Sequence, residues 1–178
     1  MDIQDLAGQI PIEGEYALEG IDFITSGEQY LTFKLANEQY GIDILCVEEI
    51  RSWEKPTTIP NAPNHVCGVI NMRGVIVPII DLRIKFNIGD AVYSETTVVI
   101  VLNLVNDDVS KTIGFVVDAV SDVLNAEESE IKDAPAFGGH VPQHFISGLV
   151  NVGDNLVTLI DTAAMQNLEP HKNKISLR

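Results

Sequence analysis

Two histidines, His140 and His144, stand four positions apart, the spacing at which two metal ligands share one face of a helix. Pro142 lies between them in a glycine-rich stretch, however, and proline interrupts a regular helix. No third ligand lies nearby in the sequence, whereas structural zinc is held by four. Surface polar residues are therefore the favoured interpretation, and we expect neither a metal nor a cofactor.

Asp81 and Asp161 are acids at matching places, each directly after an apolar run. Two carboxylates can act as general acid and general base, which makes a small hydrolase one alternative function for this chain. In the simpler interpretation each carboxylate caps the first turn of a helix and accepts backbone N–H groups there. We favour the helix caps and predict that the protein is not an enzyme.

Cys46 and Cys67 are the two cysteines of the chain, and both lie within apolar segments. A redox pair needs surroundings that lower the pKa of its thiols, which apolar neighbours do not provide. Buried, reduced thiols in a cytoplasmic protein are the simpler interpretation. The sequence also lacks a Gly-x-Ser-x-Gly elbow, a phosphate-binding glycine loop with its lysine and a Cys-x-x-Cys pair.

A few charged and aromatic side chains are better suited to binding a partner protein than to catalysis. Glu48 and Glu49 follow an apolar stripe of helical spacing, so we expect them on the solvated face of a helix. Arg73 stands at the tip of a predicted hairpin, where it serves either solubility or the docking of a partner. Phe137 lies in a loop rich in glycine and proline, and it either packs back onto the core or stays exposed.

The elements that must position these residues are written twice. Residues 68–81 return without a gap as residues 148–161, and residues 41–50 are echoed by residues 114–123 at an offset of 73. The two echoes fall in the same order, so the chain is read as two copies of one β-rich unit. Arg73 and the acidic pair Glu48-Glu49 occur in the first copy alone. A duplicated scaffold with an asymmetric surface indicates docking of different partners on different faces.

Short apolar runs separated by turn signals predict an all-β fold of small closed barrels or sandwiches, without βαβ units. The expected strands cover residues 30–35, 40–42, 69–72, 75–80, 98–102 and 113–117. The run 98–102 is apolar without alternation, which suits a strand covered on both faces at a seam between two barrels. A first unit of about 28–89 and a second of about 97–168 are expected, with strand exchange between them left open.

Helical turns and breaks complete the expected pattern. Asp43 is expected to cap a short helix that presents Ile44, Val47 and Ile50, and the two later aspartates to cap turns over 82–86 and 162–168. The prolines of residues 55–64 predict an irregular connection there. Pro78 within a return strand predicts that this strand lies at an edge or contains a bulge.

Charge excludes several classes of partner. The chain of 178 residues has a net charge of −15, which disfavours nucleic acid and anionic membrane surfaces. Residues 1–27 are acidic and read as a loosely docked tail, and residues 169–178 as a frayed end. The sequence shows no signal peptide and no apolar run long enough to span a membrane, so we expect a cytoplasmic protein without direct membrane insertion.

Several motifs together carry a family resemblance. They are Tyr40-Gly41-Ile42-Asp43-Ile44-Leu45-x-Val47-x-Glu49-Ile50-Arg51, Gly68-Val69-x-Asn71-x-Arg73-Gly74-Val75-Ile76-Val77-Pro78-Ile79-x-Asp81-Leu82-Arg83, Thr97-Val98-Val99-Ile100-Val101-Leu102 and Gly114-x-Val116-Val117-Asp118-x-Val120-Ser121-Asp122-Val123-Leu124. Over about residues 28–168 the chain resembles the CheW-like domain family of bacterial chemotaxis coupling proteins. The resemblance implies two packed five-stranded SH3-like barrels with a hydrophobic groove between them, and no catalysis. The lack of kinase and receiver domains favours a stand-alone member.

The resemblance also implies roles for particular residues. Glu49 and Arg73 match an acid–base pair at the coupling surface, and Phe137 matches an aromatic residue at a kinase-facing ring contact. Further positions match residues tied to receptor and kinase coupling, namely Val47, Gly68, Gly74, Val98, Gly114, Val120 and Val123. The implied partners are the regulatory domain of the histidine kinase CheA and the cytoplasmic tip helices of chemoreceptors, with recruitment of the protein to membrane receptor arrays. A coupling protein of a non-motility signalling array is the alternative of the same family.

Overall fold

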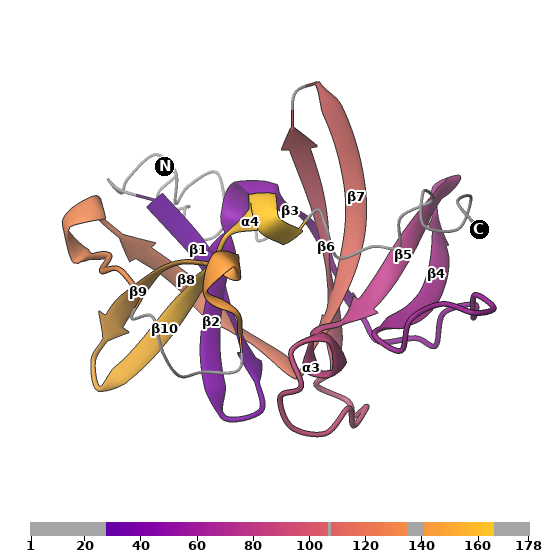
Figure 1. Ribbon diagram of the computed structural model, residues 1–178, viewed down its shortest axis with the longest axis horizontal. Helices are drawn as coiled ribbons and strands as arrows, with labels where there is room; N and C mark the ends of the chain where they lie inside the picture. The colour runs from indigo at the N-terminus through magenta and orange to yellow at the C-terminus, as the bar shows by residue number, and fades with distance from the viewer. Residues whose placement is uncertain (1–27, 107, 135–140, 166–178) are drawn as a thin grey trace, which may run out of the picture.

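The structure, a computed structural model, describes residues 28–106, 108–134 and 141–165. These residues form two five-stranded sheets that lie side by side, with short helical turns between them (Figure 1). The expected all-β fold of two packed, SH3-like barrels is therefore confirmed. The acidic tail of residues 1–27 and the frayed end of residues 169–178 lie outside the described residues.

The described elements follow one another in a regular order. The strands are β1 (Glu28–Leu35), β2 (Glu38–Asp43), β3 (Val47–Ser52), β4 (Val66–Met72), β5 (Val75–Asp81), β6 (Val98–Asn106), β7 (Val109–Val117), β8 (Ala119–Ala126), β9 (Ile146–Val152) and β10 (Asn155–Ile160). The helical turns are η1 (Ile44–Cys46), α3 (Leu82–Lys85), η2 (Glu128–Glu130), η3 (Gln143–Phe145) and α4 (Thr162–Met165).

The two copies of the sequence exchange strands. One sheet has the order β8-β1-β2-β10-β9 and the other β3-β6-β7-β5-β4; we call them the β1 barrel and the β6 barrel. The two orders are equivalent when β1 to β5 are matched in turn with β6 to β10, so that β1 takes the place of β6 and β8 the place of β3. The sequence echoes coincide with this exchange, because β4 and β5 correspond to β9 and β10. Each barrel therefore contains strands from both halves of the chain, and the units expected at 28–89 and 97–168 do not each form a barrel.

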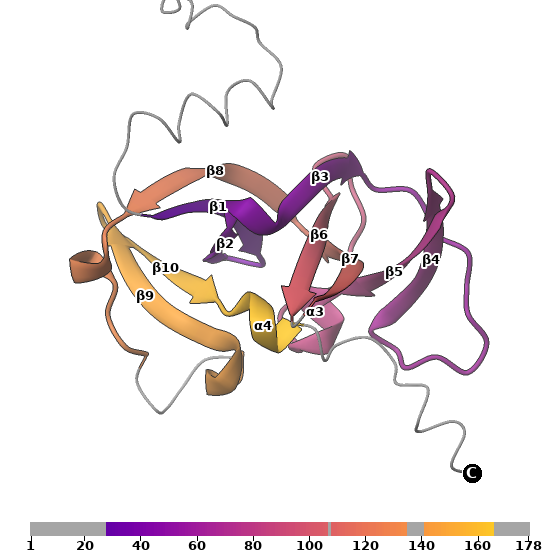
Figure 2. The same cartoon turned by 90° about the horizontal axis from the view of Figure 1, so that it is seen from above.

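Apolar side chains of the described residues form three separate clusters. The largest lies between the sheets and includes Phe33 and Ile42 from the β1 barrel together with Leu102 and Phe115 from the β6 barrel. A second cluster lies on the other face of the β6 barrel, and a third belongs to the β1 barrel. Seen from above, the two groups of strands flank the short helix α4 (Figure 2). The seam between the barrels is thus a packed core, and accessible apolar surface has to be sought at its rim.

Strand β6 confirms the prediction of a strand covered on both faces. Ile100 and Leu102 point into the cluster between the sheets, whereas Val99 and Val101 point into the cluster of the β6 barrel. Because successive side chains of a strand face opposite sides, an unbroken apolar run is what such a position requires.

The helix expected to present Val47 and Ile50 is wrong beyond its first turn. Asp43 does cap a turn, accepting the N–H of Leu45 at 2.9 Å, but this turn ends at Cys46 and strand β3 follows. The exposed edge of β6 provides backbone partners to residues 47–52, and Val47 and Ile50 face Leu102 and Ile100 there. Long-range pairing overrides the helical spacing of these apolar residues, with a register shift between Val47 and Glu49.

Pro78 does not lie on an edge strand, because β5 has β4 on one side and β7 on the other. Two features of the pairing accommodate it. Val69 lies opposite Pro78, but its backbone N–H and C=O both form hydrogen bonds with Thr57. The Val69–Pro78 pair therefore forms no backbone hydrogen bond between β4 and β5. The pairing with β7 begins only at Ile79. A residue without an N–H is therefore tolerated within a sheet at this place.

Candidate protein-docking surface

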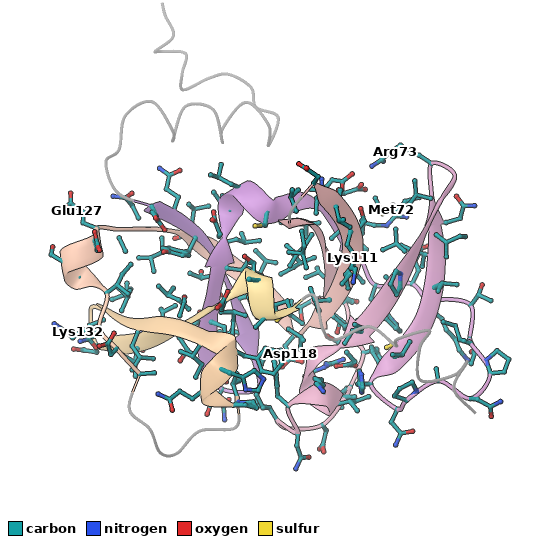
Figure 3. All side chains as sticks on the ribbon, turned by 45° about the horizontal axis from the view of Figure 1, so that its top comes forward. Met72, Arg73, Lys111, Asp118, Glu127 and Lys132 are labelled. Atoms are coloured by element: carbon teal, nitrogen blue, oxygen red, sulfur yellow. The ribbon has the colours of Figure 1, made fainter. Side chains whose placement is uncertain are left out.

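The hairpin tip between β4 and β5 presents Arg73 to solvent. Arg73 and Gly74 have φ values of 52° and 89°, the conformation of a tight hairpin turn whose two central residues both have positive φ. The side chain of Asn71 accepts the N–H of Gly74 at 2.8 Å and holds the turn. Figure 3 shows Arg73 at the outer end of this hairpin. Sequence reasoning thus placed the turn correctly, with Arg73 itself in the strained conformation.

Arg73 meets the two acids of β3 in space. Its Nη2 lies 3.3 Å from Oε1 of Glu49 and 3.5 Å from Oε2 of Glu48, and Arg51 contacts the other oxygen of Glu49 at 3.3 Å. The expected solvated helix face for the two glutamates is therefore wrong, since they lie on an edge strand. The acid–base contact that the resemblance implied between Glu49 and Arg73 is present in the structure.

This charged cluster contributes little to folding. The side chain of Arg73 is 66% exposed and that of Glu49 is 30% exposed, and ion pairs of this kind are worth about 0–1 kcal/mol. Exposed apolar side chains stand beside it in sequence, with Ile50 on β3 and Val75 and Ile76 on β5. A charge cluster flanked by exposed apolar residues is typical of a docking surface, where charges set specificity and association rate.

A second group of predicted residues gathers at the seam. Val47, Val98, Val120 and Val123 are all half-buried, and all pack against the cluster between the sheets. Val47 on β3 and Val120 on β8 occupy equivalent positions of the two copies, and each strand is the outer strand of its sheet. We call these four residues the valine rim. It is an apolar margin contributed by both barrels.

The predicted glycines have different structural reasons. Gly74 forms the exposed turn, and a Cβ there would meet nothing within 4 Å. Gly68 has a φ of 150°, and a Cβ would stand 2.1 Å from the carbonyl oxygen of Thr57, which bridges to Val69. A Cβ on Gly114 would approach Ile79 to 2.7 Å. Gly68 and Gly114 are buried, so packing within the fold by itself accounts for both.

The residues weighed for metal and redox chemistry lie apart. Phe137 and His140 are outside the described residues, and His144 in η3 packs its ring 4.2 Å from that of Phe145. Among the residues the structure describes, no group of three or more His, Cys, Asp or Glu side chains is arranged to hold a metal ion. Cys46 at the end of turn η1 and Cys67 in strand β4 are half-buried free thiols.

Burial governs the chemistry of both thiols. It raises the pKa of Cys46, with a smaller opposing effect from a hydrogen bond to Thr162. Burial together with the charge of Asp81 raises the pKa of Cys67 to about 11. Neither thiol has the lowered pKa of a reactive cysteine.

The two aspartates act as helix caps, as the sequence predicted. Asp81 accepts the N–H of Arg83 at 3.0 Å, and Asp161 accepts the N–H of Ala163 at 2.9 Å. The sequence reasoning missed a further role of Asp81, whose carboxylate also holds the buried guanidinium of Arg83. An arginine two residues after a capping aspartate, within an apolar stretch, was the signal that could have revealed this pair.

Together, the fold and these surfaces define a class of protein. Two packed barrels carry a charged hairpin tip and an apolar rim to which both barrels contribute, which are features of a docking scaffold. Among the described residues, no helix is both long and apolar enough to cross a membrane. Comparison with known proteins agrees, since the CheW-like domain model matches residues 29–169, and the chain belongs to this family.

The chain is similar to several characterised proteins. It is 45% identical over 145 residues to the chemotaxis protein CheW of Klebsiella aerogenes, covering 82% of this chain and 85% of the relative. It is 32% identical over 152 residues to CheW of Bacillus subtilis, covering 85% and 95%. A crystal structure of the scaffolding protein TtCheW from Thermoanaerobacter tengcongensis aligns with a TM-score of 0.70 at 31% identity, covering 77% of this chain and 86% of that one.

Membership of the family removes the enzymatic alternative that the sequence left open. The family consists of non-catalytic scaffold and adaptor proteins of chemotaxis, so the hydrolase alternative is set aside. The helix-cap interpretation of Asp81 and Asp161 agrees with this conclusion. The chain therefore has a coupling or scaffolding role in chemotaxis.

Proposed function

We propose that this protein is a cytoplasmic adaptor that joins the tips of transmembrane chemoreceptors to the regulatory domain of the histidine kinase CheA, within receptor arrays at the membrane. The observation that carries the proposal is the ion-pair cluster of Arg73 with Glu48 and Glu49. It is exposed, adds little to folding and lies where the family resemblance implies a coupling surface. The fold has little need of such a cluster for its own stability.

The valine rim supports a site for a receptor helix. An amphipathic helix docks by inserting apolar side chains at i, i+3, i+4 and i+7 into an apolar groove. Half-buried valines from both barrels, backed by a packed core, offer a firm surface for such side chains. Contact with strands of both barrels would let one receptor helix sense their relative position.

The charged tip supports a second docking place on the β6 barrel. Arg73 offers a guanidinium that can exchange its present acids for those of a partner, and Gly74 leaves the tip open to close approach. The remaining proposed contact residues are Gly68, Gly114 and Phe137. The first two lie within the packed fold and would act by shaping the strands, and Phe137 is assigned by the resemblance alone.

Binding to each purified partner tests the proposal. Titration calorimetry with a CheA regulatory domain, and separately with a receptor tip fragment, should give saturable one-to-one binding for each. A folded protein that binds neither fragment would contradict the proposal, and a protein that binds one alone would reduce it to a simple ligand of that partner.

A further inference from the structure

Arg83 is a fully buried arginine at the end of the seam where α3 lies. The exposed fraction of its side chain is 0%, as is that of Asp81. Its Nε and Nη2 donate to the two carboxylate oxygens of Asp81 at 3.0 and 2.9 Å, and its Nη1 donates to the carbonyl of Val92 at 2.7 Å. The ring of Tyr93 lies 5.0 Å from the guanidinium. The guanidinium of Arg83 is therefore fixed by a carboxylate, a backbone carbonyl and an aromatic ring.

The network continues from one barrel into the other. Nη1 of Arg83 also donates to Oδ1 of Asp118 at 2.6 Å. Asp118 lies between β7 and β8, where the chain passes from the β6 barrel to the β1 barrel (Figure 3). Its Oδ2 accepts the N–H of Ala36 at 2.6 Å, and its own N–H donates to the carbonyl of Lys34. Ala36 lies in the β1–β2 turn, so the guanidinium of one barrel is tied to a hairpin of the other.

Electrostatics favours the charged form of this arginine. Burial alone lowers the pKa of Arg83, but the hydrogen bonds and charges of Asp81 and Asp118 outweigh it and raise the pKa. Tyr93 donates its hydroxyl to Asp81 at 2.7 Å and stacks on Trp53, which closes the network toward the β6 barrel. We call Asp81, Arg83 and Asp118 the clasp.

The duplication supplies an internal control for the clasp. By the offset of 80, Ala163 corresponds to Arg83, and by the offset of 73, Leu45 corresponds to Asp118. The chain passes between the barrels at Leu45 as it does at Asp118, but alanine and leucine cannot form an ion pair. Leu45 is 80% exposed there. The connection between β7 and β8 is therefore held by the charged clasp, whereas the equivalent connection between β2 and β3 has no such ion pair.

The fold therefore does not require the clasp in order to connect the two barrels. A buried ion pair contributes little net stability, because desolvation offsets the Coulomb attraction, and apolar substitutes of similar volume are often as stable. A guanidinium bound to two carboxylates does provide a defined orientation, since its planar fork donates hydrogen bonds at fixed angles. A fixed hydrogen-bond geometry matters most where two structural units meet, as the β6 barrel and the β1 barrel do here.

We propose that Arg83 is a positioning residue, whose clasp fixes the orientation of the β1 barrel relative to the β6 barrel. Val47 of β3 and Val98 of β6 lie on one barrel, and Val120 and Val123 of β8 lie on the other, so the geometry of the valine rim depends on that orientation. The consequence for partner binding rests on the proposed function, whereas the orientation itself is a property of the free protein.

Residual dipolar couplings of backbone amides in the full chain test the orientation. The main variant is Arg83→Met with Asp81→Asn and Asp118→Asn, which removes the charges together and leaves no buried carboxylate without a partner. Arg83→Lys is a second variant that keeps the charge but not the planar fork. Arg73→Gln is the matched control, because it removes an ion-paired arginine from the exposed cluster.

We expect one alignment tensor to fit both barrels in the natural protein and in Arg73→Gln. In the neutral triple variant each barrel should fit a tensor of its own, and the two tensors should differ in magnitude. The lysine variant should fall between. A single tensor that fits the triple variant as well as the natural protein would overturn the proposal, as would equal loss in the Arg73→Gln control.

Affinity for a receptor tip fragment then tests the consequence. If the competent orientation falls to about a tenth of the population, the apparent affinity should fall about tenfold. Unchanged affinity beside separate tensors would show that the rim does not depend on the joint and would overturn that part. Absence of binding by the natural protein would instead count against the proposed function, while the dipolar couplings still decide the orientation.

Discussion

At the scale of single residues, Arg73 shows how an exposed group can matter to function and little to stability. We predict that Arg73→Asp changes the melting temperature hardly at all, because an exposed ion pair is worth about 0–1 kcal/mol. The same change should weaken binding to the CheA regulatory domain or the receptor fragment, since it places a third acid beside Glu48 and Glu49. Calorimetry of unfolding and of binding on one preparation measures both.

The double variant Arg73→Asp/Glu49→Arg restores opposite charges across the same gap and is the control for this prediction. Partial recovery of binding is expected. A clear loss of thermal stability with binding intact would reverse the interpretation and make Arg73 a structural residue.

Cys67 shows how burial controls a thiol. Since burial raises its pKa to about 11, little thiolate forms at neutral pH, and we predict slow alkylation whose rate keeps rising with pH well beyond pH 9. The folded pKa is above the ordinary value of 9.0, so the thiol contributes stability that is complete below pH 9 and is lost as the pH rises toward 11. Mass spectrometry of iodoacetamide adducts against pH measures the rate. A plateau near pH 8 would contradict it.

At the scale of elements, the two capping aspartates provide a matched pair of substitutions. Asp161→Ala removes a cap and should cost about 1 kcal/mol of the free energy of unfolding. Asp81→Ala removes the equivalent cap but also leaves the buried Arg83 short of a counter-charge, and should cost about 3–5 kcal/mol. Urea unfolding of both variants measures the difference. Equal costs would mean that the clasp has no energetic part in the fold.

The predicted coupling residue Gly68 acts through its strand. An added Cβ would strike the backbone of Thr57, so Gly68→Ala should cost about 1–3 kcal/mol and open the bridge to Val69. Gly74→Ala meets open space and costs about 1 kcal/mol through its positive φ alone. Hydrogen exchange of the Val69 amide, together with unfolding, distinguishes the two. Fast exchange in the Gly74 variant alone would contradict this account.

Elements also show what a sequence can and cannot reveal. The hairpin tip at Arg73, the two caps and the doubly covered β6 follow from local rules, and each was predicted. Strand β3 was mistaken for a helix because Val47 and Ile50 stand three positions apart, which is a helical spacing. Only the pairing with the open edge of β6, with its register shift between Val47 and Glu49, shows that this segment is a strand. Pro78 was predicted to lie at an edge or a bulge, and its actual accommodation could not be foreseen because it depends on Thr57, a residue distant in the sequence.

At the scale of the whole molecule, the duplication was visible but its consequence was not. Matching segments reveal two copies, yet the pairing of β1 with β8 and of β3 with β6 depends on contacts between the copies. The link from Arg83 to Asp118 was missed for the same reason, since the two residues lie 35 positions apart. Strand exchange means that neither half of the chain forms a barrel by itself, so a partner bound to both barrels acts on two covalently interwoven units.

The central claim is that this body bridges two partners at once. The most direct measurement is co-sedimentation of a CheA regulatory domain with receptor tip fragments displayed on vesicles, with and without this protein. The account predicts that the kinase domain sediments only when the protein is present, and much less when it carries Arg73→Asp. Sedimentation that is the same with and without the protein would contradict the account.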